Sequence, residues 1–145
     1  MLIILCSCKK ENLNNLEGDF VYFSTDTLLF DTVFTTVGSA TRYLKIYNNY
    51  NTDININSIK LGKESNSSFR LNIDGEASST IDNIFLRSND SLYIFAEVTI
   101  DPNNLDGAFI ETDSIIFTYE DQVQYVNLTA WGRDAYFHSG IPDYQ

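Results

Sequence analysis

The chain has 145 residues, of which 43% are hydrophobic and 14% aromatic, and this length and composition suit one domain with a buried core. Acidic side chains outnumber basic ones 20 to 9, which gives a formal net charge of -11. Because a chain this acidic repels phosphate backbones and anionic lipid, we expect no nucleic-acid partner.

Both cysteines lie within the first eight residues, as Cys6 and Cys8. The folded part of the chain therefore has no disulfide and no cysteine ligand for a metal. For a domain outside the cytosol, stability must then come from the packing of the core.

The N-terminus resembles a bacterial lipobox, in which an aliphatic residue stands three places before the lipidated cysteine and a small residue directly before it. Leu5, Ser7 and Cys8 occupy those three places, so the resemblance implies lipidation at Cys8. Only the apolar run of Leu2 to Leu5 lies between Met1 and Cys6, whereas a signal h-region has about 7–15 apolar residues. Either translation begins upstream of Met1 or the apolar start is fortuitous. We expect residues 1–8 to be a truncated lipoprotein signal and residues 9–18, which are polar and rich in Asn, to be a tether.

From residue 19 onward the sequence alternates with a period of two, which is typical of strands. Residues 27–37 are rich in Phe, Val, Leu and Thr, and residues 42–47 place Leu44 and Ile46 on one face. An Asn-rich turn follows at residues 48–51. These features predict two strands and a turn.

The next strand changes phase. Ile54 and Ile56 share one phase, whereas Ile59 and Leu61 share the other. A slip of this kind across Asn57-Ser58 indicates a bulge or a change of sheet.

The clearest alternation lies in residues 91–100, and it predicts a central strand whose one face is apolar. Residues 69–74 alternate in the same way with one wet face. Pro102 ends the central strand, because proline lacks the donor that a sheet interior requires. Residues 115–130 then predict a hairpin that reverses at Glu120-Asp121.

These elements predict an all-β fold, an immunoglobulin-like antiparallel β-sandwich of seven to eight strands over residues 19–133, followed by a tail or linker at 134–145. Neither a sustained helical period nor a repeat of 20–50 residues interrupts the pattern.

At this point the sequence resembles the ASH-like domains, immunoglobulin-like modules of the abnormal-spindle/hydin type. The likeness covers about residues 27–133 and rests on the strand pair of residues 44–61, the run of residues 98–102 ending at Pro, Gly107, and the closing residues 128–132. Together with the lipobox, residues 31–34 also resemble the N-terminal domains of Bacteroidota-type surface lipoproteins. In those proteins such a module often precedes a right-handed β-helix or another adhesive domain.

No active site is recognisable in the sequence. The one histidine, His138, lies in the expected tail, and we interpret it as a solvated linker residue. Glu97 and Glu111 offer a carboxylate pair, but an acidic sequence supplies such pairs by chance. Residues 101–112 superficially resemble a calcium loop, yet Leu105 stands where an oxygen ligand belongs and Thr112 where a Glu belongs. We therefore expect no enzyme activity, no cofactor and no metal.

Two sequence features point to a function. Tyr93 and Phe95 lie opposite the apolar face of the predicted central strand, where they form either an exposed aromatic binding face or a surface covered by a flanking strand or tail. Asp followed by Ser or Thr and an aliphatic residue occurs four times. In the lipoproteins that the chain resembles, this tripeptide is an O-glycosylation acceptor, but it is also ordinary at the start of a strand. The candidate acceptors are Thr27, Thr32, Ser91 and Ser114.

The sequence thus favours a non-catalytic, lipid-anchored domain of the bacterial outer membrane or cell surface, acting as a spacer or as a module that binds a protein or glycan. The alternative is the accessory domain of a truncated polysaccharide-active β-helix enzyme. A cytosolic interaction module would require Met1 to be the true start.

Overall fold

The computed structural model describes residue 18 and residues 20–34, 40–99 and 109–133. These residues form ten strands and one short 3₁₀ helix: β1 (Tyr22–Phe23), β2 (Thr27–Phe34), β3 (Ala40–Tyr47), β4 (Ile54–Leu61), η1 (Glu64–Asn66), β5 (Phe69–Ile73), β6 (Glu76–Ser78), β7 (Thr80–Leu86), β8 (Ser91–Val98), β9 (Phe109–Tyr119) and β10 (Gln122–Arg133). Two of them, β1 and β6, have only two and three residues. The other eight have at least five, in agreement with the predicted strand number.

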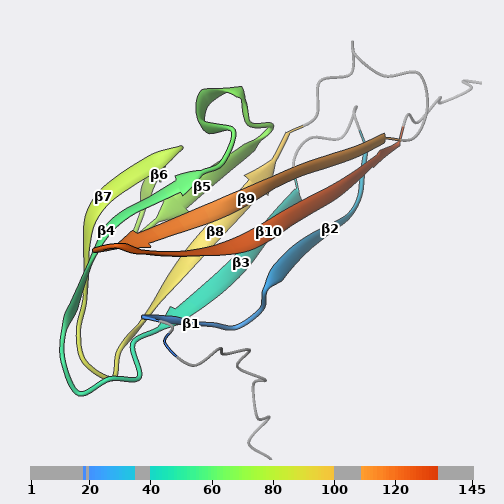
Figure 1. The fold of residues 1–145 in the computed structure, drawn as a ribbon. Coiled ribbons are helices and arrows are strands. Elements are labelled where there is room, and N and C mark those ends of the chain that lie inside the picture. The colour runs from blue at the N-terminus through green and yellow to red at the C-terminus, as the bar shows by residue number, and fades with distance from the viewer. Residues whose placement is uncertain (1–17, 19, 35–39, 100–108, 134–145) are drawn as a thin grey trace, which may run out of the picture.

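The strands form two five-stranded sheets that face one another (Figure 1). The first sheet has the order β1-β3-β8-β5-β6, and the second has the order β2-β10-β9-β4-β7. All pairs are antiparallel except β2 with β10, which run parallel. The chain enters the first sheet through β1 and crosses to the second sheet as β2.

The strand order is that of an immunoglobulin-like sandwich. In such a domain the strands A, B, E and D form one sheet and C, F and G the other. Here β1, β3, β8 and β5 take the places A, B, E and D, and β4, β9 and β10 take the places C, F and G in chain order. Three further strands, β2, β6 and β7, extend the sheet edges. The predicted fold class is therefore confirmed.

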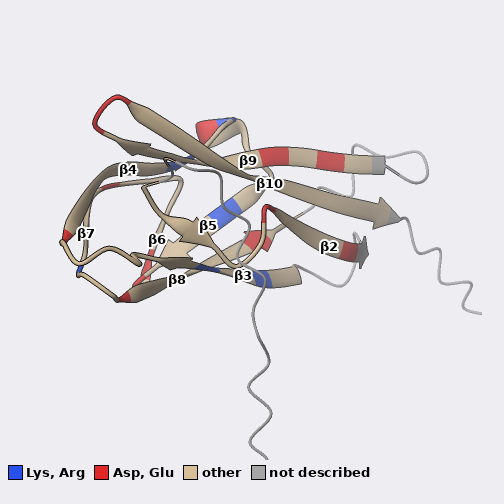
Figure 2. Ribbon diagram, turned by 60° about the horizontal axis from the view of Figure 1, so that its bottom comes forward, with Lys and Arg blue, Asp and Glu red and all other residues tan. Residues whose placement is uncertain are grey.

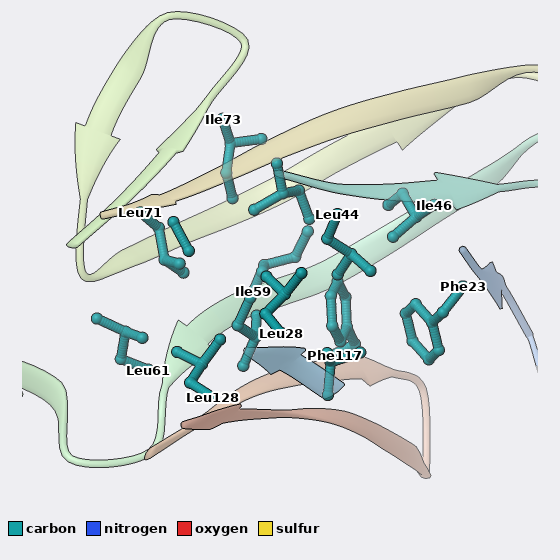
Figure 3. Packing of buried hydrophobic residues seen from close by; sticks show 14 of the residues in the cluster. Phe23, Leu28, Leu44, Ile46, Ile59, Leu61, Leu71, Ile73, Phe117 and Leu128 are labelled. Atoms are coloured by element: carbon teal, nitrogen blue, oxygen red, sulfur yellow. The ribbon is translucent and has the colours of Figure 1, made fainter. Parts of the chain in front are cut away.

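The core lies between the sheets, and Figure 3 shows side chains of both sheets projecting toward one another. Its largest fully buried side chains include Phe30, Phe69 and Phe117. Ring contacts cross the layer, since the centroids of Phe30 and Phe69 lie 5.4 Å apart and those of Phe23 and Phe117 4.8 Å apart. Burying one such side chain contributes about 1.5–3 kcal/mol, so this core can stabilise a domain that has no disulfide.

The predicted central strand is β8, which lies in the middle of the first sheet between β3 and β5. Its residues Ile94, Ala96 and Val98 are fully buried, whereas Tyr93 and Phe95 are exposed. The predicted hairpin is also present, because β9 and β10 pair from Tyr119 and Gln122 outward across a two-residue turn.

The phase slip in β4 occurs inside one strand of one sheet. Asn57 lies opposite Asn83 of β7 in a register that is continuous on both sides, but these two residues are not paired. Asn83 has a φ of 56°, a left-handed conformation that asparagine tolerates better than most residues, and the side chain of Asn57 accepts a hydrogen bond of 2.9 Å from the backbone N–H of Glu120. Both strands change phase together, so Ile54, Ile56, Ile59 and Leu61 are all buried.

The sequence analysis did not predict β7. Its residues Thr80–Leu86 include Asp82 and Asn83, and the change of phase removes the alternation that marks a strand. The strand is held by its partner, because β7 pairs with β4 over the length of both.

Candidate functional site

The outer face of the first sheet carries a cluster of exposed aromatic side chains on its two central strands. On β3 the residues Tyr43, Lys45 and Tyr47 alternate with the buried Leu44 and Ile46, and therefore point away from the core. On β8 the residues Tyr93 and Phe95 do the same. The register places Tyr43 beside Phe95 and Lys45 beside Tyr93. We call these five residues, Tyr43, Lys45, Tyr47, Tyr93 and Phe95, the aromatic face.

The rings of the aromatic face contact one another while staying open to solvent. The ring centroids of Tyr43 and Tyr93 lie 5.7 Å apart, and those of Tyr93 and Phe95 lie 6.4 Å apart with the planes nearly parallel. The exposed fractions are 60% for Tyr43, 47% for Tyr93 and 43% for Phe95. Contiguous exposed apolar surface of this kind is typical of binding sites rather than of ordinary solvated surface.

Lys45 lies at one end of the aromatic face and contacts two tyrosine rings. The Lys45 ammonium lies 4.8 Å from the centroid of the Tyr47 ring and 5.2 Å from that of Tyr93. Each such cation–π contact contributes about 0.5–1 kcal/mol at an exposed site. The two contacts favour an arrangement in which the ammonium of Lys45 lies between Tyr47 and Tyr93.

At the other end, beyond Phe95, the surface is hollowed. The hollow has a volume of about 400 Å³. Its lining combines the ring of Phe95 with polar side chains from three strands, and we call it the polar hollow: Thr41, Arg70, Leu71, Asn72, Ala77, Phe95 and Glu97. The register explains this meeting, because Glu97 of β8 stands between Thr41 of β3 and Arg70 of β5.

Two side chains of the polar hollow are held by the backbone. Nη1 of Arg70 donates to the carbonyl oxygens of Ser67 and Phe69, both at 3.2 Å. The side-chain oxygen of Asn72 accepts a hydrogen bond of 3.1 Å from the N–H of Gly75 in the β5–β6 turn. These bonds fix the guanidinium and amide planes before any ligand arrives, which lowers the entropic cost of binding.

Basic and acidic side chains are distributed over both sheets. Figure 2 shows a basic band on β5, which is Arg70, while acidic residues stand at the β9–β10 turn and along β9 of the other sheet. The aromatic face itself contains one basic residue, Lys45, and no acidic one.

The outer face of the second sheet also exposes large side chains, but they do not form a cluster of rings. Tyr125 is 64% exposed and Trp131 is 40% exposed. In β10 these two residues are separated by Asn127 and Thr129 on the same face, and no ring contact joins them in the described part of the chain.

Among the described residues, no strand covers Tyr93 and Phe95. The other cover named in the sequence analysis, a tail, lies outside the described residues. The sequence analysis missed Tyr43, Lys45 and Tyr47 of the aromatic face, and also the polar hollow. The alternation around Leu44 and Ile46 already assigns Tyr43 and Lys45 to the outer face, but only the pairing of β3 with β8 brings them beside Tyr93.

The four candidate O-glycosylation residues lie in different surroundings. Thr27 and Ser91 are half-buried at the first positions of β2 and β8, and Thr32 belongs to β2 with its side chain outside the described part. Ser114 is half-buried in β9, and a Cβ added at Gly62 would lie 2.8 Å from its hydroxyl oxygen. The glycosylation of these residues stays a prediction.

The aspartate before Ser114 has a structural role. One carboxylate oxygen of Asp113 accepts hydrogen bonds from the N–H of Lys63 at 3.1 Å and of Ser114 at 2.7 Å, and the other accepts one from the hydroxyl of Ser67. Asp113 therefore ties β9 to the segment that joins β4 and β5.

Of the other candidate site residues from the sequence analysis, the structure describes some and not others. Glu97 lies in β8 and Glu111 in β9, on different sheets. Glu111 instead lies near Lys63, with 3.8 Å between the carboxylate oxygen and the ammonium nitrogen. Cys8, His138 and the calcium-like residues 101–107 lie outside the described residues.

The described residues contain neither a cluster of metal ligands nor a membrane-spanning helix. Within residues 20–34, 40–99 and 109–133, no group of three or more His, Cys, Asp or Glu side chains is arranged to hold a metal ion. The described residues also include no helix long and apolar enough to cross a membrane.

Comparisons with known proteins identify the fold. No family model matches the sequence, and no curated protein is detectably similar to it. Among solved structures, a family 123 glycoside hydrolase from Clostridium perfringens is similar over 76% of this chain and 23% of its own length, with a TM-score of 0.52 and 8% identity. A protein of unknown function from Porphyromonas gingivalis W83 is similar over 88% of this chain and 51% of its own, with a TM-score of 0.52 and 16% identity. The E. coli chaperone DraB gives a TM-score of 0.46 at 10% identity.

The two structures with a TM-score of 0.52 share the fold of this chain. The chain spans about a quarter of the length of the glycoside hydrolase and about half the length of the Porphyromonas gingivalis protein.

Proposed function

We propose that this domain is a non-catalytic module of the bacterial cell envelope, anchored through a lipid on Cys8, which binds a surface partner through the aromatic face. The observation that carries the proposal is the cluster of three mutually contacting rings, each between 43% and 60% exposed, at the centre of a five-stranded sheet. Aromatic residues dominate the energetics of binding sites, because a rigid ring buries a large area at a small cost in side-chain entropy.

The position on the sheet supports the proposal. β3 and β8 pair over eight consecutive residues, so the rings stand on a rigid platform and not on loops. A module that recognises a partner without chemistry needs only such a preorganised surface. The resemblance to ASH-like domains of Bacteroidota-type lipoproteins supports the envelope location and the anchor at Cys8.

The alternative is an accessory domain of a polysaccharide-active enzyme. One observation favours it: a region with this fold occurs in the family 123 glycoside hydrolase from Clostridium perfringens, whose structure concerns hydrolysis of glycolipid glycans. In that case the aromatic face would hold the polymer on which a neighbouring catalytic domain acts.

The test uses the full chain carrying Cys8→Ser, so that no acyl chain contributes to binding, and intact Bacteroidota cells as the probe. We expect the protein to sediment with the cells in a saturable manner. Tyr93→Ala combined with Phe95→Ala should weaken this binding by about 30-fold, which corresponds to about 2 kcal/mol. The melting temperature should change little, because both rings are about half exposed.

The matched control is Val123→Ala combined with Tyr125→Ala on the outer face of the other sheet, where both side chains are more than 60% exposed. This pair should bind as the parent does. Equal losses in the two double variants, or no loss in either, would contradict a binding role for the aromatic face.

A further inference from the structure

We propose that the aromatic face and the polar hollow together form a binding site for a neutral polysaccharide of the β-glucan type, in which one sugar ring stacks on Phe95 with its hydroxyl groups directed into the polar hollow. This inference rests on the proposed function and names the chemical class of its partner.

The stacking half of the site follows from the chemistry of aromatic rings. The face of an aromatic ring carries partial negative charge, so it attracts the weakly positive C–H groups of a pyranose. A sugar whose hydroxyl groups are equatorial presents those C–H groups together on the flat sides of its ring. Tyr43, Tyr93 and Phe95 lie within 6.4 Å of one another by ring centroids and cover two adjacent strands, which suits a chain of such rings.

The polar half of the site lies next to Phe95. The polar hollow places a hydroxyl, a guanidinium, an amide and a carboxylate around that ring, from Thr41, Arg70, Asn72 and Glu97. Sugar hydroxyls donate and accept at once, so they need both kinds of partner within one small site. A volume of about 400 Å³ lies within the usual range for small-ligand sites, about 300–1,000 Å³.

The negative net charge of the chain disfavours the binding of acidic polysaccharides. The chain carries a formal net charge of -11, so a polyuronate or a sulfated glycan meets long-range repulsion as it approaches. Near the site, one arginine and one glutamate line the polar hollow and offset each other. An uncharged polysaccharide is therefore the ligand that suits this site.

Two charged side chains of the site favour a glycan over a protein partner. Lys and Glu are depleted at the buried centre of protein–protein interfaces, whereas Arg and aromatic residues are enriched there. Here Lys45 lies between two rings of the aromatic face, and Glu97 lies beside a third. Such groups suit a ligand that is covered with hydroxyls.

The experiment is affinity electrophoresis of the full chain carrying Cys8→Ser in native gels that contain a soluble polysaccharide. The probes are mixed-linkage β-glucan and hydroxyethylcellulose as neutral polymers, and polygalacturonate as the acidic one. We expect retardation by at least one neutral polymer and none by polygalacturonate.

Two substitutions at one position separate stacking from general apolar contact. Phe95→Tyr keeps an aromatic face and should retain affinity within about threefold, whereas Phe95→Leu should lose about tenfold or more. The matched control is Tyr125→Leu on the other sheet, which should be retarded as the parent is. Equal retardation of Phe95→Leu and Phe95→Tyr would overturn the stacked-sugar assignment.

The outcomes also distinguish this inference from the proposed function. If neither neutral polymer retards the protein, while binding to cells still depends on Tyr93 and Phe95, the module binds through the aromatic face and the glycan assignment is overturned. Loss of cell binding after protease treatment of the cells, with no competition by β-glucan, would identify a protein partner and overturn it as well. If cell binding is independent of the aromatic face, both proposals fail.

Discussion

Asn48 is a fully buried polar residue that joins two loops at one end of the sandwich. Its side-chain nitrogen lies 2.8 Å from the carbonyl oxygen of Thr52 and 3.0 Å from that of Arg87, and its side-chain oxygen accepts a hydrogen bond of 3.1 Å from the N–H of Tyr50. One amide thus satisfies backbone groups of the β3–β4 loop and of the β7–β8 turn. Composition marks residues 48–51 as a turn, but only the tertiary structure shows that one of its three asparagines is buried.

Replacement of Asn48 by alanine should lower the free energy of unfolding by about 2–4 kcal/mol, because it leaves buried backbone groups without hydrogen-bond partners. Urea denaturation followed by circular dichroism measures the change. The adjacent Asn49 is exposed, so Asn49→Ala should stay within about 0.5 kcal/mol of the parent. Similar urea midpoints for the two variants would contradict the linking role of Asn48.

At the scale of the element, β8 separates two functions between its two faces. Ile94, Ala96 and Val98 are fully buried in the core, while Tyr93 and Phe95 point outward beside the polar hollow. Substitutions on the two faces should therefore affect different properties, stability on one side and binding on the other. The alternation of residues 91–98 predicts this division, because neighbouring side chains of a strand point to opposite faces.

The inward face can be tested with the same substitution at two isoleucines. Ile94→Ala removes a fully buried side chain and should cost about 2–5 kcal/mol, because it leaves a cavity. Ile110 of β9 is 61% exposed, so Ile110→Ala should cost less than about 0.5 kcal/mol. Denaturant midpoints measure both. An equal loss at the two sites would show that the assignment of the faces of β8 is wrong.

At the scale of the whole molecule, the two sheets leave the aromatic face pointing away from the core, on a chain that carries a net charge of -11. Strong negative charge keeps such a domain away from anionic lipid headgroups. Attachment to a membrane would then depend on covalent lipid, which is the role proposed for Cys8.

With a complete signal h-region placed upstream of Leu5 and expression in a bacterium, the substitution Cys8→Ser should move the protein from the detergent phase to the aqueous phase in a Triton X-114 partition. One acyl chain gives only marginal membrane binding, so stable partition requires the two or three chains that a lipobox cysteine receives. Cys6→Ser is the matched control and should remain in the detergent phase. If the parent and Cys8→Ser partition alike, the anchor proposal is wrong.

The sequence by itself predicted the strands in which inward-facing apolar residues alternate regularly with outward-facing residues. The alternation in residues 91–98 and the two arms around Glu120-Asp121 are local patterns, and local patterns are sufficient because side-chain direction in a strand has a period of two. The core could also be identified in this way, since Leu44, Ile46 and Ile94 are all fully buried as predicted. The phase slip at Asn57 was visible as well.

Only the tertiary structure decided which strands are neighbours. β2 pairs in parallel with β10, and Thr27 and Asn127 are partners although about 100 residues separate them. In the same way, β3 meets β8 across more than 40 residues, and this pairing puts Tyr43 beside Phe95. The pairing of distant strands depends on loop closure and on how both sheets pack together, which no short window of sequence contains. The aromatic face is therefore a property of the fold, although each of its residues could be assigned to an outer face from the sequence.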